Sequence, residues 1–510
     1  MVKLKRARNS FLNISKLPPE ILGNIFHWNV AFNDKFGGLE RESHNFLSVC
    51  YHWSKVASHT PELWSFWGNT LGDWARWYRR SETAPLDLVL DEGECYGVFL
   101  DATLRSALQD RATADRIRRV HITADNSALV TSIIASLTAE CEGIRSNRVE
   151  SLVLRCYDED GGADLSDFFA HYHFPTLRRL NLTNCATSSW DHLTSRTGAL
   201  AHLMLSFGGY ESGPTTSQLL SILASNPILQ KLTLCGWGVP DDGGGKSSFR
   251  VPLYHLKKLK LTGDSRDVIR FLYRLDYPTN MDRLTLNLEG CTTMEIPQAI
   301  GPYFRDYLRG RSGFQSGLGL FLSFNHQVML RVGDAHRTGL PPQWMDTFME
   351  IVLKMDDVLS NNAKEKVMLD LIAHAPQEET VYFRTYGNPL AMKNVYARFP
   401  NLRTLYLEDI PLSAVFPRPN SDGGDGILLS LQYLFLDRLV VDDCDWSPLT
   451  TFLARRASSG NRLDVLNISW SPHMCSEVVE SISGVVQKLT IECQNPDCPS
   501  GTCLLGYFSP

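Results

Sequence analysis

Several common signals are missing from this 510-residue sequence. It contains no run of 18 apolar residues, so no membrane-spanning helix is expected. No apolar stretch follows the basic residues near its start, so no signal peptide is expected either. The net charge is −6, and charged residues make up 21% of the chain, as in many globular proteins. We therefore predict that its partners include no membrane and no nucleic acid.

Cysteine is too sparse for a disulfide scaffold, with 12 residues in the whole chain. Most cysteines stand within apolar strand patterns, as Cys156 and Cys185 do, where a thiol acts as a small hydrophobic group. Cys493, Cys498 and Cys503 are spaced at the edge of the range found in structural zinc sites, and ordinary thiols are the preferred interpretation. This cysteine usage predicts a reducing compartment, and hence a cytoplasmic or nuclear protein.

Catalytic signatures are also absent. The sequence has no dinucleotide-binding glycine motif after a strand, no GxSxG and no HExxH. Gly243–Ser247 resembles a phosphate loop superficially but lacks its first glycine, and His171 with His173 would supply only two metal ligands. We predict a protein that is not an enzyme, with no catalytic residue, no metal and no cofactor.

Residues 1–12 form a short basic tail, and residues 13–70 predict three short helices. Pro18 and Pro19 suit the first turn of a helix, and Pro61 suits the first turn of another. Six of the 11 tryptophans lie before residue 80, which is a large apolar content for so small a module. We expect a partner or the following domain to cover part of this surface. The residues of this module that could contact such a partner are Leu17, Pro18, Ile21, Leu22, Ile25, Phe26, Val49, Cys50, Trp53, Val56 and Trp64.

This segment resembles the F-box motif, and especially the F-box-like proteins of mushroom-forming fungi. The resemblance covers about 50 residues and lies in a leucine-proline pair, an isoleucine-phenylalanine pair, a valine-cysteine-x-x-tryptophan and a closing proline-x-leucine-tryptophan. In that family the helices bind the Skp adaptor and, through it, a cullin ubiquitin ligase. The resemblance therefore implies that the residues listed above include the adaptor-binding positions. Residues 71–116 resemble the linker and first strand that follow in these fungal proteins.

From residue 117 to 510 an apolar-x-x-apolar-x-apolar pattern returns at intervals of about 23–32 residues, which is typical of leucine-rich repeats. Segments with helical periodicity lie between the patterns, including Ser127–Thr138, Ser217–Ala224, Asp267–Leu275 and Pro448–Arg455. Strand, helix and strand in succession predict a parallel β/α unit. We predict an α/β protein: a three-helix F-box followed by an irregular leucine-rich-repeat-like solenoid, with parallel strands inside and helices outside.

Residues 341–375 interrupt this rhythm. Trp344, Phe348, Ile351 and Met355 fit the spacing of a longer amphipathic helix. The pattern predicts a helical insertion that interrupts the array, or a break between two sub-arrays.

The residue between the last two apolar members of each pattern should face away from the core on the concave side. These positions include Asn181, Met204, Thr233, Thr285 and Asn467. Basic residues dominate earlier in the array and aromatic residues dominate later. We therefore predict that the basic half binds acidic or phosphorylated segments of the target and that the aromatic half supplies anchoring contacts to it. The candidate target-binding residues are Arg178, Arg179, Lys257, Lys258, Lys260, Arg283, Tyr406, Tyr433 and Phe435.

Two functions fit these expectations. The first is a substrate-recruiting subunit of a Skp–cullin–F-box (SCF) ubiquitin ligase, which binds Skp through the F-box and an unknown target protein through the repeats. The alternative is a non-catalytic repeat scaffold that pairs with Skp without delivering a target for ubiquitination.

Overall fold

The computed structural model describes residues 13–34, 46–68, 74–91, 107–108, 110–138, 145–146, 148–158, 162–188, 190–208, 213–237, 250–291, 295–310, 318–324, 328–334, 346–355, 361–376, 380–387, 398–416, 428–441, 445–471 and 474–493. The chain divides into two compact units. The first unit consists of Met1–Leu256 with Arg274–Asp276, and the second of Lys257–Tyr273 with Tyr277–Pro510.

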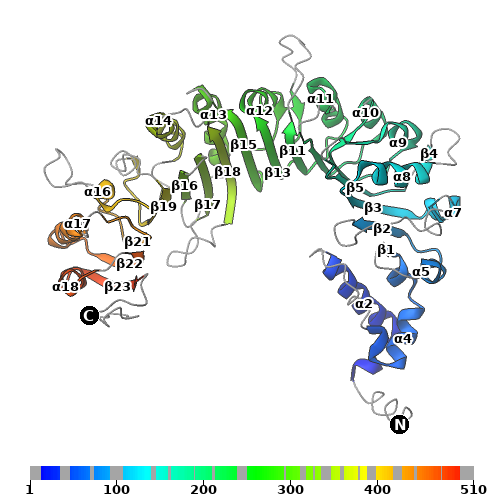
Figure 1. The fold of residues 1–510 in the computed structure, drawn as a ribbon, viewed down its shortest axis with the longest axis horizontal. Coiled ribbons are helices and arrows are strands. Elements are labelled where there is room, and N and C mark those ends of the chain that lie inside the picture. Colours follow the sequence, from blue (N-terminus) through cyan, green and yellow to red (C-terminus); the bar gives the residue numbers. More distant parts are fainter. Residues whose placement is uncertain are drawn as a thin grey trace. The chain divides into compact units, whose positions relative to one another are not determined.

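The first unit begins with short helices (Figure 1). The segment predicted as the second helix is divided, because Cys50 takes an extended backbone conformation between α3 and α4. The segment predicted as the third helix is a single 3₁₀ turn, η3. The elements are η1 (Asn13–Lys16), α2 (Pro19–Asp34), α3 (Phe46–Val49), α4 (Tyr51–Ser58) and η3 (Pro61–Trp64).

A parallel sheet makes up the rest of the first unit. Each strand pairs with the next one in the list that follows, and every one of these pairings is parallel. The strands are β1 (Phe66–Gly68), β2 (Leu86–Asp91), β3 (Ile117–Ala124), β5 (Ser151–Cys156), β8 (Arg179–Thr183), β10 (His202–Ser206) and β11 (Lys231–Trp237).

The repeated apolar residues of the sequence stack in register across this sheet. Leu152 pairs with Val120 and with Leu180, and Leu154 pairs with Ile122 and with Leu182. All of these side chains are buried. Burying one large aliphatic side chain stabilises a fold by about 1.5–3 kcal/mol, so the stacked rows stabilise the contact between neighbouring strands.

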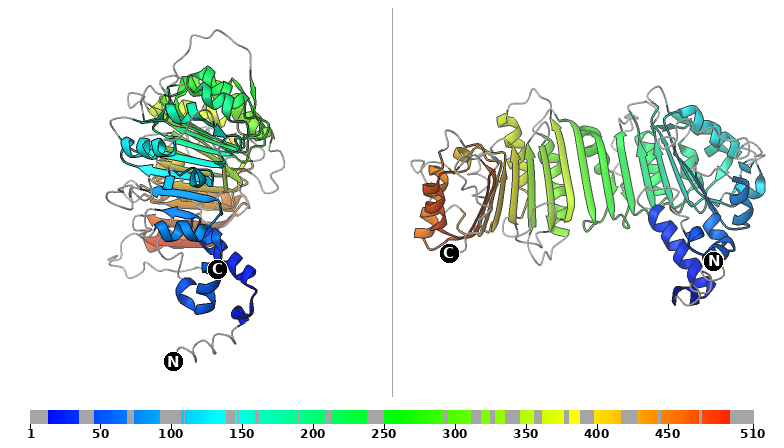
Figure 2. Two further views of the ribbon diagram at one scale, coloured as in Figure 1. Left: turned by 90° about the vertical axis from the view of Figure 1, so that its right-hand side faces the viewer. Right: turned by 60° about the horizontal axis from the view of Figure 1, so that its bottom comes forward.

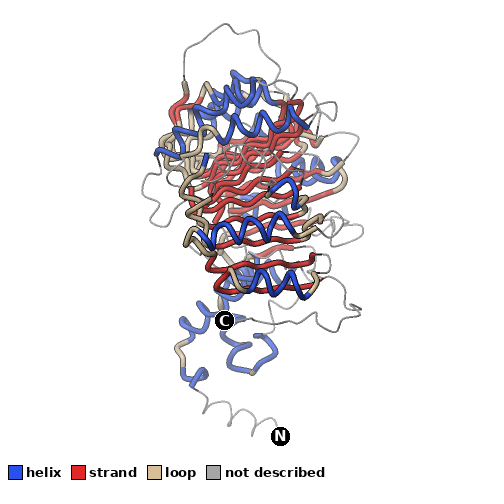
Figure 3. The backbone as a smooth tube through the Cα atoms, turned by 90° about the vertical axis from the view of Figure 1, so that its left-hand side faces the viewer, coloured by secondary structure: helices blue, strands red, loops and turns tan. Residues whose placement is uncertain are grey.

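Helices pack against these strands. Figure 3 draws the helices of the chain in blue and its strands in red. The helix predicted at Ser127–Thr138 is confirmed as α8, which contacts β3 and β5. The other helices of this unit are α5 (Trp74–Ser81), α7 (Arg111–Ala114), α9 (Ser166–His171), α10 (Asp191–Arg196) and α11 (Thr216–Ala224). Two-residue strands form three further parallel pairs: β4 (Arg145–Ser146) with β7 (Tyr172–His173), β6 (Ala163–Asp164) with β9 (Cys185–Ala186), and β12 (Val251–Pro252) with β14 (Leu275–Asp276).

The second unit contains a sheet that is mostly parallel (Figure 2). Its spatial order is β13, β15, β18, β17, β16, β19, β20, β21, β22 and β23, and only β17 runs antiparallel to its neighbours. The strands are β13 (Lys258–Asp264), β15 (Arg283–Cys291), β16 (Leu318–Phe324), β17 (Val328–Asp334), β18 (Asp346–Met355), β19 (Thr380–Gly387), β20 (Thr404–Glu408), β21 (Tyr433–Asp437), β22 (Leu463–Ser471) and β23 (Val486–Cys493). The helices are α12 (Ser265–Leu272), α13 (Glu295–Gly310), α14 (Asn361–Ile372), α16 (Leu412–Val415), α17 (Ser447–Ser458) and α18 (Ser476–Ser483).

The prediction of one long helix within residues 341–375 is wrong. Residues 346–355 form strand β18, and a helix follows only at α14. Met349 and Ile351 of β18 pair with Leu284 and Leu286 of β15, and their side chains are buried. The segment pairs with β15 on one side and β17 on the other, so it continues the sheet as a strand.

The mixed α/β class and the largely parallel strands agree with the sequence-based prediction. In the part of the chain that the structure describes, no helix combines the length and hydropathy needed to cross a bilayer.

Candidate functional site

The amino-terminal helices share a small apolar core. Leu22 and Phe26 of α2 are buried together with Val56 of α4 and Trp64 of η3. The ring of Phe26 lies 5.1 Å from that of Trp53, and the ring of Trp64 lies 5.0 Å from that of Trp77 in α5. Trp77 therefore extends this core beyond residue 70, into the segment predicted as a linker.

Local interactions fix the angles between these helices. The Cys50 Sγ accepts a hydrogen bond from the Trp53 backbone N–H at 3.5 Å and so caps α4. The Trp64 indole N–H donates to the Ala57 carbonyl at 2.7 Å, which ties η3 to α4. A Cβ atom at Gly23 would lie 3.3 Å from the Thr60 Oγ1, so the absence of a side chain lets α2 approach the start of η3.

A second face of α2 carries exposed apolar side chains. Ile21, Ile25 and Trp28 are 47%, 43% and 72% exposed. Their spacing of four and then three residues places them on one face of the helix. Leu22 and Phe26, one position further along, face the core. Ile21, Ile25 and Trp28 form what we call the α2 stripe; large apolar side chains grouped this way are typical of a surface that another protein covers.

The structure sorts the predicted adaptor-binding residues by exposure. Leu22, Phe26, Val56 and Trp64 are buried, so they stabilise the helices and are not accessible to a partner. Leu17, Cys50 and Trp53 are half-buried, whereas Pro18, Ile21, Ile25 and Val49 are exposed. Trp28 was not among the predicted positions, although its spacing from Ile21 and Ile25 is visible in the sequence.

The predicted basic residues belong to both units. Arg178 and Arg179 are exposed in the first unit. Lys257, Lys258, Lys260 and Arg283 are exposed in the second unit, where Lys258 pairs with Arg283 across β13 and β15. Arg283 also lies 3.7 Å from Glu350, which neutralises part of that charge.

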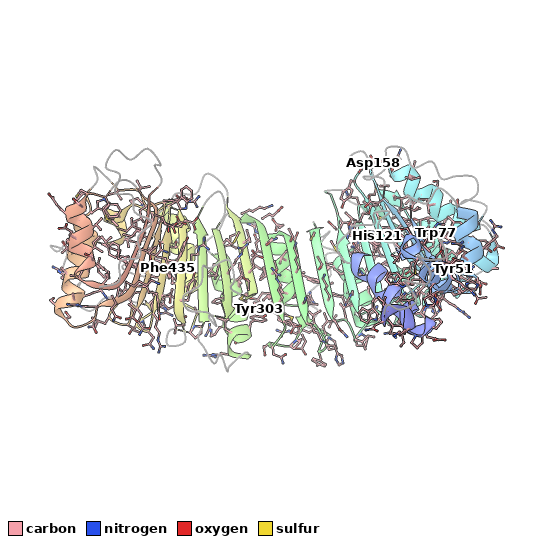
Figure 4. All side chains as sticks on the ribbon, turned by 90° about the horizontal axis from the view of Figure 1, so that it is seen from below. Tyr51, Trp77, His121, Asp158, Tyr303 and Phe435 are labelled. Atoms are coloured by element: carbon pink, nitrogen blue, oxygen red, sulfur yellow. The ribbon has the colours of Figure 1, made fainter. Side chains whose placement is uncertain are left out.

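The predicted aromatic residues are held in a network on the second unit's sheet. Tyr406 is half-buried and stacks on Phe435 with ring centroids 6.0 Å apart (Phe435 is labelled in Figure 4). Its hydroxyl donates to Asp437 at 2.7 Å, and the Arg384 guanidinium lies 4.4 Å from its ring. Burial and then the hydrogen bond to Asp437 raise the pKa of Tyr406 above its ordinary value. Tyr433 is also half-buried.

Ion pairs lie beside this aromatic network. Glu408 is buried and forms ion pairs with Arg384 and Arg438. Arg438 also lies 3.5 Å from Asp409. The aromatic side chains are thus held by contacts within the chain. They are therefore weaker candidates for contacts to a target protein.

Not all of the positions expected to face outward are exposed. Asn181, Thr233 and Thr285 are buried, whereas Met204 and Asn467 are half-buried. The first three are short side chains flanked by longer ones on adjacent strands, such as Met204 beside both Asn181 and Thr233. Exposure on this face therefore depends on the length of a side chain and of its neighbours on the adjacent strands, as well as on whether the residue points toward or away from the core.

The weaker metal candidates are only partly covered by the described residues. The His171 Nδ1 lies 2.7 Å from the Asp167 carbonyl oxygen one helical turn earlier, a local hydrogen bond. Cys498 and Cys503 lie outside the described residues, and the side chain of Cys493 is not described. Among the residues that are described, no group of three potential ligands is close enough to hold a metal ion.

The sequence matches no protein-family model, and a search of curated proteins found no match. The functional assignment therefore depends on the residues of the amino-terminal helices and on the surfaces of the two sheets.

Proposed function

We propose that this chain is a substrate-recruiting subunit of a Skp–cullin–F-box ubiquitin ligase. Its amino-terminal helices, residues 13–70, are the F-box and bind the Skp adaptor. The strands and helices that follow form an irregular leucine-rich-repeat-like array that binds a target protein. The chain itself contributes no catalytic residue; it raises the effective concentration of the target near a ubiquitin-charged enzyme held elsewhere on the cullin.

The α2 stripe is the observation that carries this proposal. Helix α2 uses Leu22 and Phe26 for its own core and still presents Ile21, Ile25 and Trp28 to solvent. Exposing three large apolar groups on one helix has an energetic cost that binding a partner removes. The stripe lies within the segment whose residues resemble the F-box motif, where that resemblance implies an adaptor.

The first prediction is that the double variant Ile21→Ser and Ile25→Ser no longer binds the Skp adaptor. Burying an isoleucine contributes about 1.5–3 kcal/mol, so losing two should weaken binding by about 100-fold or more. Binding would be measured by titration calorimetry with purified adaptor. Far-UV circular dichroism would show that the variant is folded, since both side chains point away from the core.

The matched control is Ile228→Ser, because Ile228 is 45% exposed and lies outside the amino-terminal helices. It should bind the adaptor like the unmodified chain. Equal affinity of all three proteins would contradict the proposal. Adaptor binding without ubiquitin transfer to co-purifying proteins, in a ligase reconstituted with cullin and charged enzyme, would favour the alternative of a scaffold that delivers no target.

A further inference from the structure

The parallel register of the first unit brings basic residues from three strands together. On the face away from the core, Ser151 of β5 pairs with Arg119 of β3 and Arg179 of β8. Four residues further along β5, Arg155 occupies the same face. We call Arg119, Arg155 and Arg179 the arginine triangle.

The spacing of a parallel sheet sets the size of this triangle. Arg119 and Arg179 are separated by one strand, so their backbones are about 10 Å apart, and Arg155 lies about 13 Å further along the strands. Val153 lies near the centre of the triangle and is buried. Arginine side chains are long enough to converge over such a floor, and Arg119 and Arg155 both lower the pKa of Arg179, after burial, by their charge.

The triangle carries more positive charge than its surroundings neutralise. Asp87 pairs with Arg118 at 3.0 Å and with Arg119 at 3.6 Å, so one carboxylate serves two guanidinium groups. No described carboxylate forms an ion pair with Arg155 or Arg179. In the second unit, by contrast, Glu408 and Asp409 each lie within ion-pair distance of an arginine.

Two polar side chains lie beside Val153 on the floor of the triangle. His121 and Asn181 are its lateral neighbours on β3 and β8, and Figure 4 labels His121 on the strands of the first unit. Asn181 is 3% exposed, and its side-chain oxygen has no hydrogen-bond partner within the described residues. A buried acceptor without a donor is unfavourable, and a backbone N–H of a bound peptide segment would satisfy it.

We propose that the arginine triangle binds a phosphorylated serine or threonine in an extended segment of the target protein. Three guanidinium groups around one point suit a compact dianion, because each can donate paired hydrogen bonds to phosphate oxygens. The Asn181 oxygen would accept a hydrogen bond from a backbone N–H of the bound segment and makes no contact with the phosphate. A carboxylate side chain carries half that charge and satisfies fewer donors. A nucleic acid is a poorer match, because the chain as a whole has a net charge of −6.

This inference rests on the proposed function only in calling the ligand a target. The test therefore uses the full chain without adaptor. Fluorescence anisotropy would be measured with a labelled alanine–glycine peptide that carries one phosphoserine, and with matched peptides that carry serine or glutamate. The phosphoserine peptide should bind at least about tenfold more tightly than either, since charge-assisted contacts distinguish them.

The double variant Arg155→Gln and Arg179→Gln should reduce phosphopeptide binding to the level of the serine peptide. It should remain folded, because the change removes mutual repulsion. Each single variant should give part of this loss, and Arg155→Lys should retain less than full affinity because lysine lacks the paired donors. Arg250→Gln, an exposed arginine of the same unit outside the triangle, is the matched control.

Three outcomes would overturn the assignment: equal binding of the phosphoserine and serine peptides, unchanged phosphopeptide binding by the double variant, or displacement of the phosphopeptide by short single-stranded DNA at lower concentration than by free phosphoserine. None of these results bears on adaptor binding by the α2 stripe. The experiments can therefore contradict phosphopeptide binding without contradicting the proposed function, and the reverse.

Discussion

His121 is a histidine whose surroundings disfavour its charged form. Burial, and then the charges of Arg155 and Arg179, lower its pKa from 6.5 to about 4, while Asp91 opposes the shift. Its ring nitrogen Nε2 lies 3.4 Å from the Thr123 hydroxyl. The neutral imidazole lets three arginines share one face of the sheet without a fourth positive charge among them.

The stability of the first unit should therefore fall when the pH is lowered. Below about pH 6.5 the unfolded chain binds a proton at His121 that the folded chain binds only near pH 4, so the free energy of unfolding decreases across that window and levels off below it. We expect a loss of about 2 kcal/mol from this group, since it is partly solvated.

Urea unfolding of His121→Gln between pH 7 and pH 4 tests this expectation. The variant should lack the His121 component of the pH dependence, whereas His255→Gln, an exposed histidine of the same unit, should keep it. Parallel pH profiles for the unmodified chain and His121→Gln would show that His121 is not held neutral by the fold.

At the scale of elements, strands in both units end in the same way. Asn184, Asp409 and Arg438 follow β8, β20 and β21 with φ angles of 49°, 53° and 48°. Each donates its backbone N–H to a carbonyl of the neighbouring strand. The acceptors are Ser206, Asp437 and Ser469, at 2.8, 3.1 and 3.0 Å. The left-handed turn directs the following side chain, such as Cys185 after Asn184, into the core.

Helix α17 is tied to the start of β21 by one buried arginine. The Arg456 guanidinium donates to the carbonyls of Leu428, Leu429 and Leu431, which precede that strand. The side chain is 5% exposed, and burial lowers its pKa. Its role is to satisfy carbonyl groups that would otherwise be buried without donors.

We predict that Arg456→Met destabilises this part of the second unit by about 3 kcal/mol, because the apolar chain fits but the carbonyls lose their donors. Hydrogen exchange measured by mass spectrometry should show faster exchange of the β21 amides. Arg462→Met, at an exposed position after the same helix, should change exchange little. Unaltered protection of β21 in Arg456→Met would mean that these hydrogen bonds are dispensable.

At the scale of the whole molecule, cysteine chemistry tests the compartment. The described cysteines Cys50, Cys156, Cys185, Cys235, Cys291 and Cys475 are all free thiols. Cys185 is buried, and burial raises the pKa of its thiol to about 12, so it is unreactive in the folded chain.

We expect the 12 cysteines of freshly isolated native protein to react as thiols once the chain is denatured without reductant. The measurement is a count of alkylated cysteines by mass spectrometry. The discovery of several protected disulfides would contradict a cytoplasmic or nuclear location.

The sequence by itself determined which residues form the stacked core. Recurring leucines predicted the strands, and α8, α11 and α17 appear close to where helical periodicity placed them. Local patterns suffice for these elements because the apolar residues of each strand or helix recur with the period of that element. Which face of α2 is buried was decided by the structure, because the sequence resemblance assigned Ile21, Leu22, Ile25 and Phe26 alike to adaptor binding.

Only the tertiary structure decided the order β15, β18, β17, β16 and β19 and the strand conformation of β18. The spacing of Ile351 and Met355 is compatible with a helix, and pairing with β15 is a non-local interaction that no local period reveals. The sequence alone also did not show the arginine triangle. Its members lie on three separate strands, and only the pairing of those strands brings them close together. Sequence pattern specifies what each segment buries, whereas strand pairing specifies which side chains become neighbours on the surface.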